Sequence, residues 1–333
     1  MTLPLVDVSR FRDPAQREAF LADLRHAAHD VGFFYVVGHG VPPEVTDGVM
    51  AAAREFFALP LEQRLEIENM NSRHFRGYSR VGTERTGGAA DQREQIDVGP
   101  ERQAIADIPA DKPYLRLVGP NQWPSAAPGL RPAVLGWLSE ADRVAREVLR
   151  ALSAALGQDE TYFDAWFDDE AYPHVKVVRY PAREQVDSDQ GVGAHKDYGW
   201  LALLLQDDLG GLQVEAADGS WIDARPVPGA FVVNIGELLE VATQGYLRAT
   251  RHRVVSPAGR ERFSIPFFLD PRLDAVVEPL QLPRELAAEA RGVEDDPDNP
   301  LLAQYGEKSL LGWLRSHPKV AERWHPDLLA RSR

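Results

Sequence analysis

The sequence has 333 residues, a length that suits one large domain or two ordinary ones. Hydrophobic residues make up 44% and charged residues 26%, as in a globular protein with a sizeable core, and the net charge of −14 disfavours nucleic acid or an anionic membrane as the main partner. The chain contains no cysteine, so disulfides, thiolate nucleophiles, zinc ribbons and iron–sulfur clusters are excluded.

From the sequence we expect neither a membrane anchor nor a secretion signal. No apolar run approaches the roughly 20 residues of a membrane-spanning helix. The first residues lack a basic segment followed by a long apolar one. We therefore expect a cytoplasmic protein without a membrane partner.

Periodicity predicts helices and strands in the N-terminal half of the chain. Apolar residues recur every three to four positions in three segments that are bounded by proline or glycine. The expected helices are 13–31, 43–59 and 133–156, and the expected strands are 3–8 and 33–37. His39 follows in a turn between two glycines, where we expect it to bond to the backbone rather than to a metal.

The stretch from Asn71 to Gly99 is polar, rich in glycine and without clear periodicity. A loop of this length inside a compact domain is usually functional or disordered. Its aromatic residues and mixed charges favour function, so Arg76, Arg93 and Glu94 are candidate substrate contacts. The alternative is a solvated surface loop.

From His174 onward the chain consists mainly of short apolar segments. Their spacing of about 8 to 12 residues is typical of a β-sandwich or jelly roll. The expected strands are 175–181, 193–197, 200–206, 230–236, 247–255 and 262–269, with a turn into a further strand over 208–214 and a hairpin at 219–222. Helices are expected over 237–243 and 301–314. Phe231 and Phe268 lie on two of these strands and are candidates for lining a cavity, with a plain core role as the alternative.

Three residues in the second half of the chain could bind a metal. His195 and Asp197 are two positions apart, and such residues point to the same face of a strand. With His252 they could form the facial triad of non-haem Fe(II) oxygenases, whereas the alternative is a buried histidine paired with an aspartate. Arg262 and Ser264 follow, and an arginine beside a hydroxyl suits a carboxylate ligand.

The order of these motifs resembles that of the isopenicillin N synthase-like Fe(II)/2-oxoglutarate-dependent oxygenases. The resemblance runs nearly from end to end. It is carried by Leu5–Asp7, Gly32–Gly40, Arg179–Pro181, Ala194–Gly199, Gly210–Val214, Asn234–Leu239, Arg251–Val254 and Arg262–Ser264. It implies a mainly β fold with flanking helices, whose core is a double-stranded β-helix, or jelly roll.

The resemblance also implies the cofactors and their ligands. His195, Asp197 and His252 would hold Fe(II), and Arg262 and Ser264 would hold the far carboxylate of 2-oxoglutarate. Oxygen would be the second cosubstrate. The implied reaction is hydroxylation, desaturation or cyclisation of a small molecule, with release of succinate and CO₂.

One strand departs from the family pattern. Plant members usually have asparagine at the position of Val178, whereas Lys176 and Arg179 place cations on this strand. The chain is in this respect closer to bacterial members, including the ethylene-forming enzymes. Tyr180 and Lys176 are candidate cosubstrate contacts, and the alternative for Lys176 is solvent.

We expect one catalytic domain over residues 1–333. An N-terminal region (1–120) would pack on the jelly-roll core with the Fe(II) and 2-oxoglutarate sites (171–272), and a helical tail (300–333) would follow. Two alternatives stay open: a same-fold Fe(II) oxidase that does not use 2-oxoglutarate, and a non-catalytic binding protein. The mixed charges of 76–97 favour a polar, amino-acid-like substrate, and the oligomeric state is not determined by the sequence.

Overall fold

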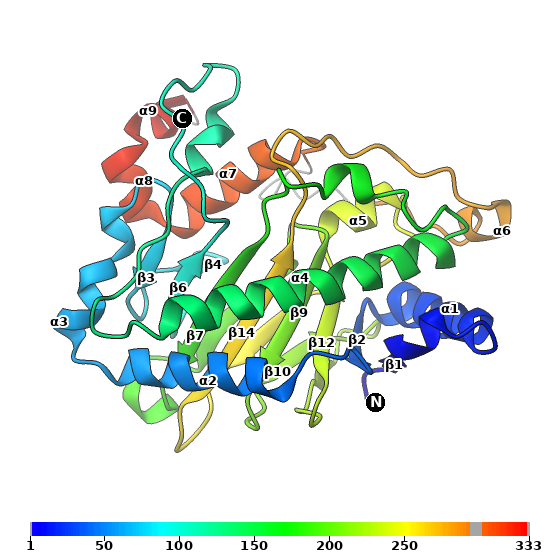
Figure 1. Cartoon of the computed structure of the whole chain (residues 1–333), viewed down its shortest axis with the longest axis horizontal. Coiled ribbons are helices and arrows are strands. Elements are labelled where there is room, and N and C mark those ends of the chain that lie inside the picture. Colours follow the sequence, from blue (N-terminus) through cyan, green and yellow to red (C-terminus); the bar gives the residue numbers. More distant parts are fainter. Residues whose placement is uncertain (1, 294–301, 332–333) are drawn as a thin grey trace.

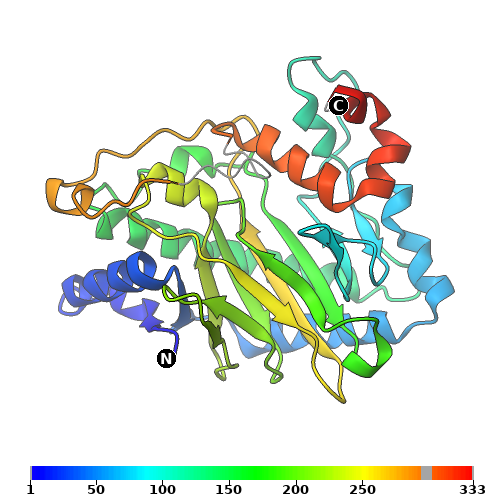
Figure 2. The same ribbon diagram turned by 180° about the vertical axis from the view of Figure 1, so that it is seen from behind.

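The computed structural model describes residues 2–293 and 302–331. Within them, two β-sheets form the centre, and helices lie on one side of the sheets and at both ends of the molecule (Figures 1 and 2). The larger sheet has the order β1 (Leu5–Asp7), β2 (Phe33–Val37), β12 (Phe231–Ile235), β9 (Leu201–Gln206), β14 (Arg262–Leu269), β7 (His174–Tyr180), β6 (Glu94–Val98) and β3 (Gly77–Ser79). The smaller sheet has the order β11 (Trp221–Asp223), β10 (Leu212–Glu215), β13 (His252–Val255) and β8 (Gln190–His195).

A separate hairpin and a set of helices complete the described chain. The hairpin pairs β4 (Arg85–Thr86) with β5 (Ala89–Ala90). The helices are α1 (Arg17–His26), α2 (Pro43–Ala58), α3 (Leu61–Arg64), α4 (Leu130–Ala155), α5 (Glu237–Ala242), α6 (Arg284–Ala287), α7 (Tyr305–Ser316), α8 (Pro318–Trp324) and α9 (Pro326–Arg331). α7 to α9 and α1 lie at opposite ends of the molecule, as Figures 1 and 2 show.

The central strands of the larger sheet bury both of their faces. α4 and α2 cover one face, and α4 presents a continuous apolar stripe to it (Figure 1). Because successive side chains of a strand point to opposite faces, β14 divides into two sets. Phe263, Ile265, Phe267 and Leu269 pack in the core on the helix side. Arg262, Ser264, Pro266 and Phe268 line a cavity between the two sheets.

The predicted elements agree with the structure in most segments. The predicted helices 43–59 and 133–156 correspond to α2 and α4, and the predicted strand 262–269 is β14. Leu301, where the helical tail was expected to begin, lies outside the described residues, and α7 begins at Tyr305. The N-terminal region contributes β1, β2, β3 and β6 to the larger sheet, so this region and the core share one sheet.

The predicted long loop over 71–99 is wrong for much of its length. β6 and β3 extend the larger sheet beyond β7. In Glu94–Val98 the apolar Ile96 and Val98 alternate with Gln95 and Asp97, but both faces of β6 are buried, so its polar side chains lie inside the protein as well. Ion pairs, rather than water, satisfy its two carboxylates, Glu94 and Asp97. In the ranges 2–293 and 302–331, no helix is long and apolar enough to cross a membrane.

Candidate metal centre and its cavity

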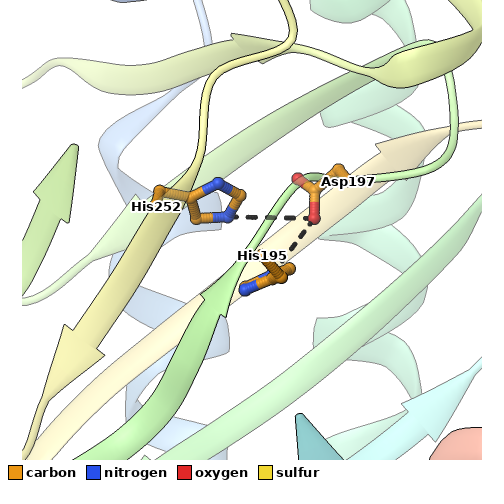
Figure 3. A group of neighbouring side chains, drawn as sticks. All are labelled: His195, Asp197 and His252. Carbon is orange, nitrogen blue, oxygen red and sulfur yellow. Dashed lines mark ion pairs between the residues drawn. The ribbon is translucent and has the colours of Figure 1, made fainter. Parts of the chain in front are cut away.

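Two histidines and one aspartate meet at the smaller sheet (Figure 3). His195 ends β8 and His252 begins β13, and the antiparallel register pairs them directly, with ring centroids 4.3 Å apart. Asp197 lies in the loop after β8, so a single strand carrying both His195 and Asp197 was a wrong prediction. Its carboxylate nevertheless turns back: Oδ1 lies 3.4 Å from His195 Nε2 and 3.8 Å from His252 Nε2.

The backbone orients both imidazole rings. Nδ1 of His195 lies 2.8 Å from the carbonyl oxygen of Gly193, and Nδ1 of His252 lies 3.3 Å from that of Thr250. When Nδ1 donates in this way, the lone pair of each Nε2 is left for a metal. Such outer bonds fix the tautomer and the direction of histidine ligands.

Asp197 is held as a carboxylate. Asn234 on β12 donates to its Oδ2 at 2.8 Å, which leaves Oδ1 for a metal. Burial opposes the charge, but His252 and the hydrogen bond with His195 hold the pKa of Asp197 well below its usual range. Burial, with His195 nearby, lowers the pKa of His252 to about 4. Burial disfavours charge on His195 as well, yet its hydrogen bond with Asp197 raises its pKa. Asp197 and His252 are thus in their ligand forms at neutral pH, and any proton on His195 Nε2 would have to leave when a metal binds there.

A cationic clamp faces this centre from the larger sheet. Arg262 is 0% exposed and Ser264 is 2% exposed, both on the cavity side of β14. Arg262 Nη2 donates to Gln206 at 3.1 Å, whereas its Nε and Nη1 find no acceptor in the described part of the chain. Its guanidinium lies 4.9 Å above the ring of Tyr180. Because buried donors are normally satisfied, this pair of orphan N–H groups fits the carboxylate of an anionic ligand.

The centre and the clamp share one cavity of ≈ 1160 Å³. This exceeds the roughly 300–1,000 Å³ of most small-molecule sites, so it has room for a cosubstrate and a second small molecule. Four of the other predicted contacts line it: Tyr180, Lys176, Arg93 and Phe268. Lys176 therefore faces the cavity and not solvent.

Two predicted substrate contacts lie elsewhere. Arg76 is 1% exposed and donates to the hydroxyl of Tyr172 and to the carbonyl of Leu117, within the core. Glu94 is on the helix-side face of β6, where it pairs with Arg64 and Arg179. Neither is among the described residues that line the cavity, so the prediction that they contact substrate is corrected.

Phe231 also lies away from the cavity. On β12 it shares the phase of Val233 and Ile235, which pack toward the helices. Its ring stacks on His39 and meets Trp137 edge to face. The core alternative is thus confirmed. His39 lies 3.0 Å from the carbonyl of Gly229, as expected for a histidine bonded to backbone.

A buried group of charges in the cavity wall was not predicted. Glu84 pairs with Arg93 at 2.6 Å and with Lys176 at 3.1 Å. Lys176 also pairs with Asp97 at 2.8 Å, and His317 lies 3.1 Å from Glu84. Burial opposes the charge of Glu84, but Arg93 and Lys176 lower its pKa. We call these five residues the charged wall. They come from separate segments and form no motif; the one sequence signal was a lysine in the apolar strand predicted over 175–181.

Two family models match the chain. Residues 3–126 match the model described as non-haem dioxygenase in morphine synthesis N-terminal. Residues 172–271 match the model of the 2OG-Fe(II) oxygenase superfamily, and this range contains His195, Asp197, His252 and Arg262.

The chain is similar to known proteins over most of its length. It is 35% identical to the 2-oxoglutarate-dependent dioxygenase frbJ of Dothideomycetidae sp. (strain 11243), over 99% of this chain and 94% of that protein. It is 35% identical to homoarginine-6-hydroxylase 2-ODD-C23.1 of Arabidopsis thaliana, over 87% of this chain and 91% of that protein. The crystal structure of a full-length Neurospora crassa protein in complex with alpha-KG and thymine has a TM-score of 0.75 and 27% identity, covering 93% of this chain and 96% of that one. The predicted jelly roll with flanking helices is confirmed.

Proposed function

The chain belongs to the 2OG-Fe(II) oxygenase superfamily, and we propose that His195, Asp197 and His252 hold its iron. It is a 2-oxoglutarate-dependent dioxygenase, an oxidoreductase that uses Fe(II) and 2-oxoglutarate. The observation that carries the ligand assignment is the convergence of two Nε2 atoms and one carboxylate oxygen whose neighbouring atoms are already bonded. When bound, iron and 2-oxoglutarate supply the oxidising chemistry, and the protein binds, orients and shields the reactants.

The clamp would hold the far carboxylate of 2-oxoglutarate. Arg262 offers two unused N–H groups, Ser264 offers a hydroxyl, and the Tyr180 ring covers the guanidinium. Lys176 is already bonded to two carboxylates, so we place it in the charged wall rather than on the cosubstrate. The predicted closeness to bacterial members stays a prediction.

The charged wall favours a substrate that carries a cation. Two carboxylates of the wall, Glu84 and Asp97, and the neighbouring Asp91 face its two permanent cations, Arg93 and Lys176. Each of the two cations already pairs with two carboxylates. A further positive charge would therefore find a partner at this wall, whereas a further negative charge would not. Exposed arginines also line the cavity: Arg85, Arg251 and Arg315. An amino acid with a cationic side chain would match both features, and several relatives are named homoarginine-6-hydroxylases.

Turnover is expected to release one succinate for each product formed, because the clamp and the metal centre together suit a two-ended dianion. The enzyme is incubated with Fe(II), oxygen and a panel of amino acids, with and without 2-oxoglutarate, and succinate and product are quantified. Full product formation without 2-oxoglutarate would contradict the proposal and restore the oxidase alternative. Anaerobic addition of Fe(II) and 2-oxoglutarate gives a second readout, the visible charge-transfer band of the chelate.

Glu84→Gln is expected to weaken binding of a cationic substrate by about 10- to 100-fold, since a hydrogen bond to a charged group contributes about 1.5–3 kcal/mol. The probes are L-homoarginine and its neutral isostere L-homocitrulline, and the readout is the KM of each from substrate-stimulated succinate release. The KM of the neutral L-homocitrulline should rise far less, because this compound has no charge to pair with Glu84.

Glu94→Gln is the matched control. It makes the same chemical change at a glutamate that is equally buried but lies on the other face of the sheet. It is expected to lower stability and leave both KM values near those of the wild type.

If acidic or apolar compounds alone stimulated succinate release, the proposed cationic substrate class would be wrong, whereas the enzyme class would still hold.

A further inference from the structure

Asp91 joins the wall of the cavity to the strand that carries His195. It is 0% exposed and lies just after the β4–β5 hairpin. Its Oδ1 accepts from the backbone N–H of Gly193 and from Gln190 Nε2, both at 3.1 Å. Its Oδ2 accepts from the hydroxyl of Thr86 at 2.7 Å and lies 3.5 Å from Arg93. One carboxylate thus bonds to β8 with one oxygen and to two cavity-lining side chains with the other.

The residue that Asp91 holds on β8 is the one that orients a candidate ligand. The Gly193 carbonyl accepts from Nδ1 of His195 at 2.8 Å, so the position of this residue sets the direction of the ring. The hairpin also packs tightly here: a Cβ on Gly193 would lie 3.0 Å from the Cβ of Thr86. A shift of the hairpin would therefore reach Gly193 both through Asp91 and through direct contact.

We propose that Asp91 is a positioning residue for the metal centre, which holds Gly193 so that His195 presents Nε2 to the metal, and which ties this geometry to the cavity wall. The inference rests on the proposed iron ligands. Asp91 does not reach the centre itself, and its effect passes through Gly193 and His195. Outer partners of metal-ligating histidines typically change metal affinity by about 10- to 100-fold when removed.

Metal titration tests this role without turnover. Metal-free protein is titrated anaerobically with Mn(II), a redox-stable stand-in for Fe(II), and the melting temperature of each metal-free variant is recorded. Asp91→Ala is expected to bind Mn(II) about 10- to 100-fold more weakly. Asp91→Asn should stay within about threefold of wild type, because its oxygen can accept from Gly193 while its amide donates to Thr86 Oγ1. Thr86→Val, which removes only the hairpin donor, should weaken binding about threefold, and Thr86→Ser should restore it.

Asn69→Ala separates positioning from general loss of stability. Asn69 is buried and donates to Ser79 Oγ at 2.8 Å, and it is outside the described lining of the cavity. The Asn69→Ala substitution should lower the melting temperature and leave the affinity for Mn(II) unchanged. Wild-type affinity in Asp91→Ala, or an equal loss in Asn69→Ala at equal melting temperature, would overturn the inference and leave the proposed ligands intact. Failure of the wild type itself to bind Mn(II), or unchanged binding in His252→Ala, would overturn the proposed ligands and this inference with them.

Discussion

Replacing His252 with alanine is expected to abolish iron-dependent turnover and to remove most of the metal affinity. Among the described residues, His252 supplies one of the two imidazoles at the centre, and its Nε2 lies 3.8 Å from Asp197 Oδ1. With two ligands left, the chain could no longer form the three-ligand face that a non-haem Fe(II) site requires. Iron content after anaerobic reconstitution and succinate release in the same preparation measure the two effects.

The fold of the His252→Ala variant should survive. His252 packs against Phe33 and His195 at the edge of the cavity, where its loss leaves no carboxylate without another partner, because Asn234 still donates to Asp197. His39→Ala is the matched control: this histidine is bonded to backbone, stacks on Phe231 and should retain both iron and turnover. Normal iron stoichiometry and activity in His252→Ala would show that the ligand assignment is wrong.

Arg262→Ala is expected to weaken 2-oxoglutarate binding on the order of 10²–10³-fold. Removing one partner of a buried charge pair costs roughly 3–5 kcal/mol, and each 1.4 kcal/mol corresponds to about tenfold in affinity. Arg262 is fully buried, so solvent would not replace the lost interaction. Titration of the anaerobic Fe(II) enzyme with 2-oxoglutarate, followed by the charge-transfer band, gives the affinity directly.

Two further variants sharpen the result for Arg262. Arg262→Lys should recover only part of the affinity, since an ammonium cannot donate as a planar fork. Arg253→Ala removes a guanidinium next to His252 that stacks on Trp221 at 4.1 Å, on the other face of β13, and should leave 2-oxoglutarate affinity unchanged. An unchanged affinity in Arg262→Ala would remove the clamp from the proposal.

Several features of the metal centre follow from local sequence. His195, Asp197 and His252 were identified by residue type and order, and the i, i+2 spacing of Arg262 and Ser264 put them on one face of β14. The long helices were also predictable, since α4 repeats its apolar residues at helical spacing over 26 residues. In each of these cases the determining interactions lie within one segment of the chain.

Which face of a buried strand meets the cavity could not be predicted from local pattern. Phe231 and Phe268 both lie on apolar strands, yet only Phe268 has the phase that points between the sheets. The sequence carries no sign of this difference, because helices bury one face as fully as the smaller sheet buries the other. β6 was missed for the same reason. Both of its faces are buried, and ion pairs rather than solvent satisfy its polar residues, so its composition did not indicate a strand.

The sequence by itself determined the kinds of atoms available for iron and for a carboxylate, because those depend on residue identity and on spacing within one strand. Only the tertiary structure decided which distant charges meet at the cavity. Glu84, Lys176 and His317 come together because β7, the hairpin region and the end of α7 converge there. Asp91 likewise reaches Gly193 across 102 positions of the chain. Such contacts arise from the packing of whole elements, and each partner is an ordinary polar residue in its own segment.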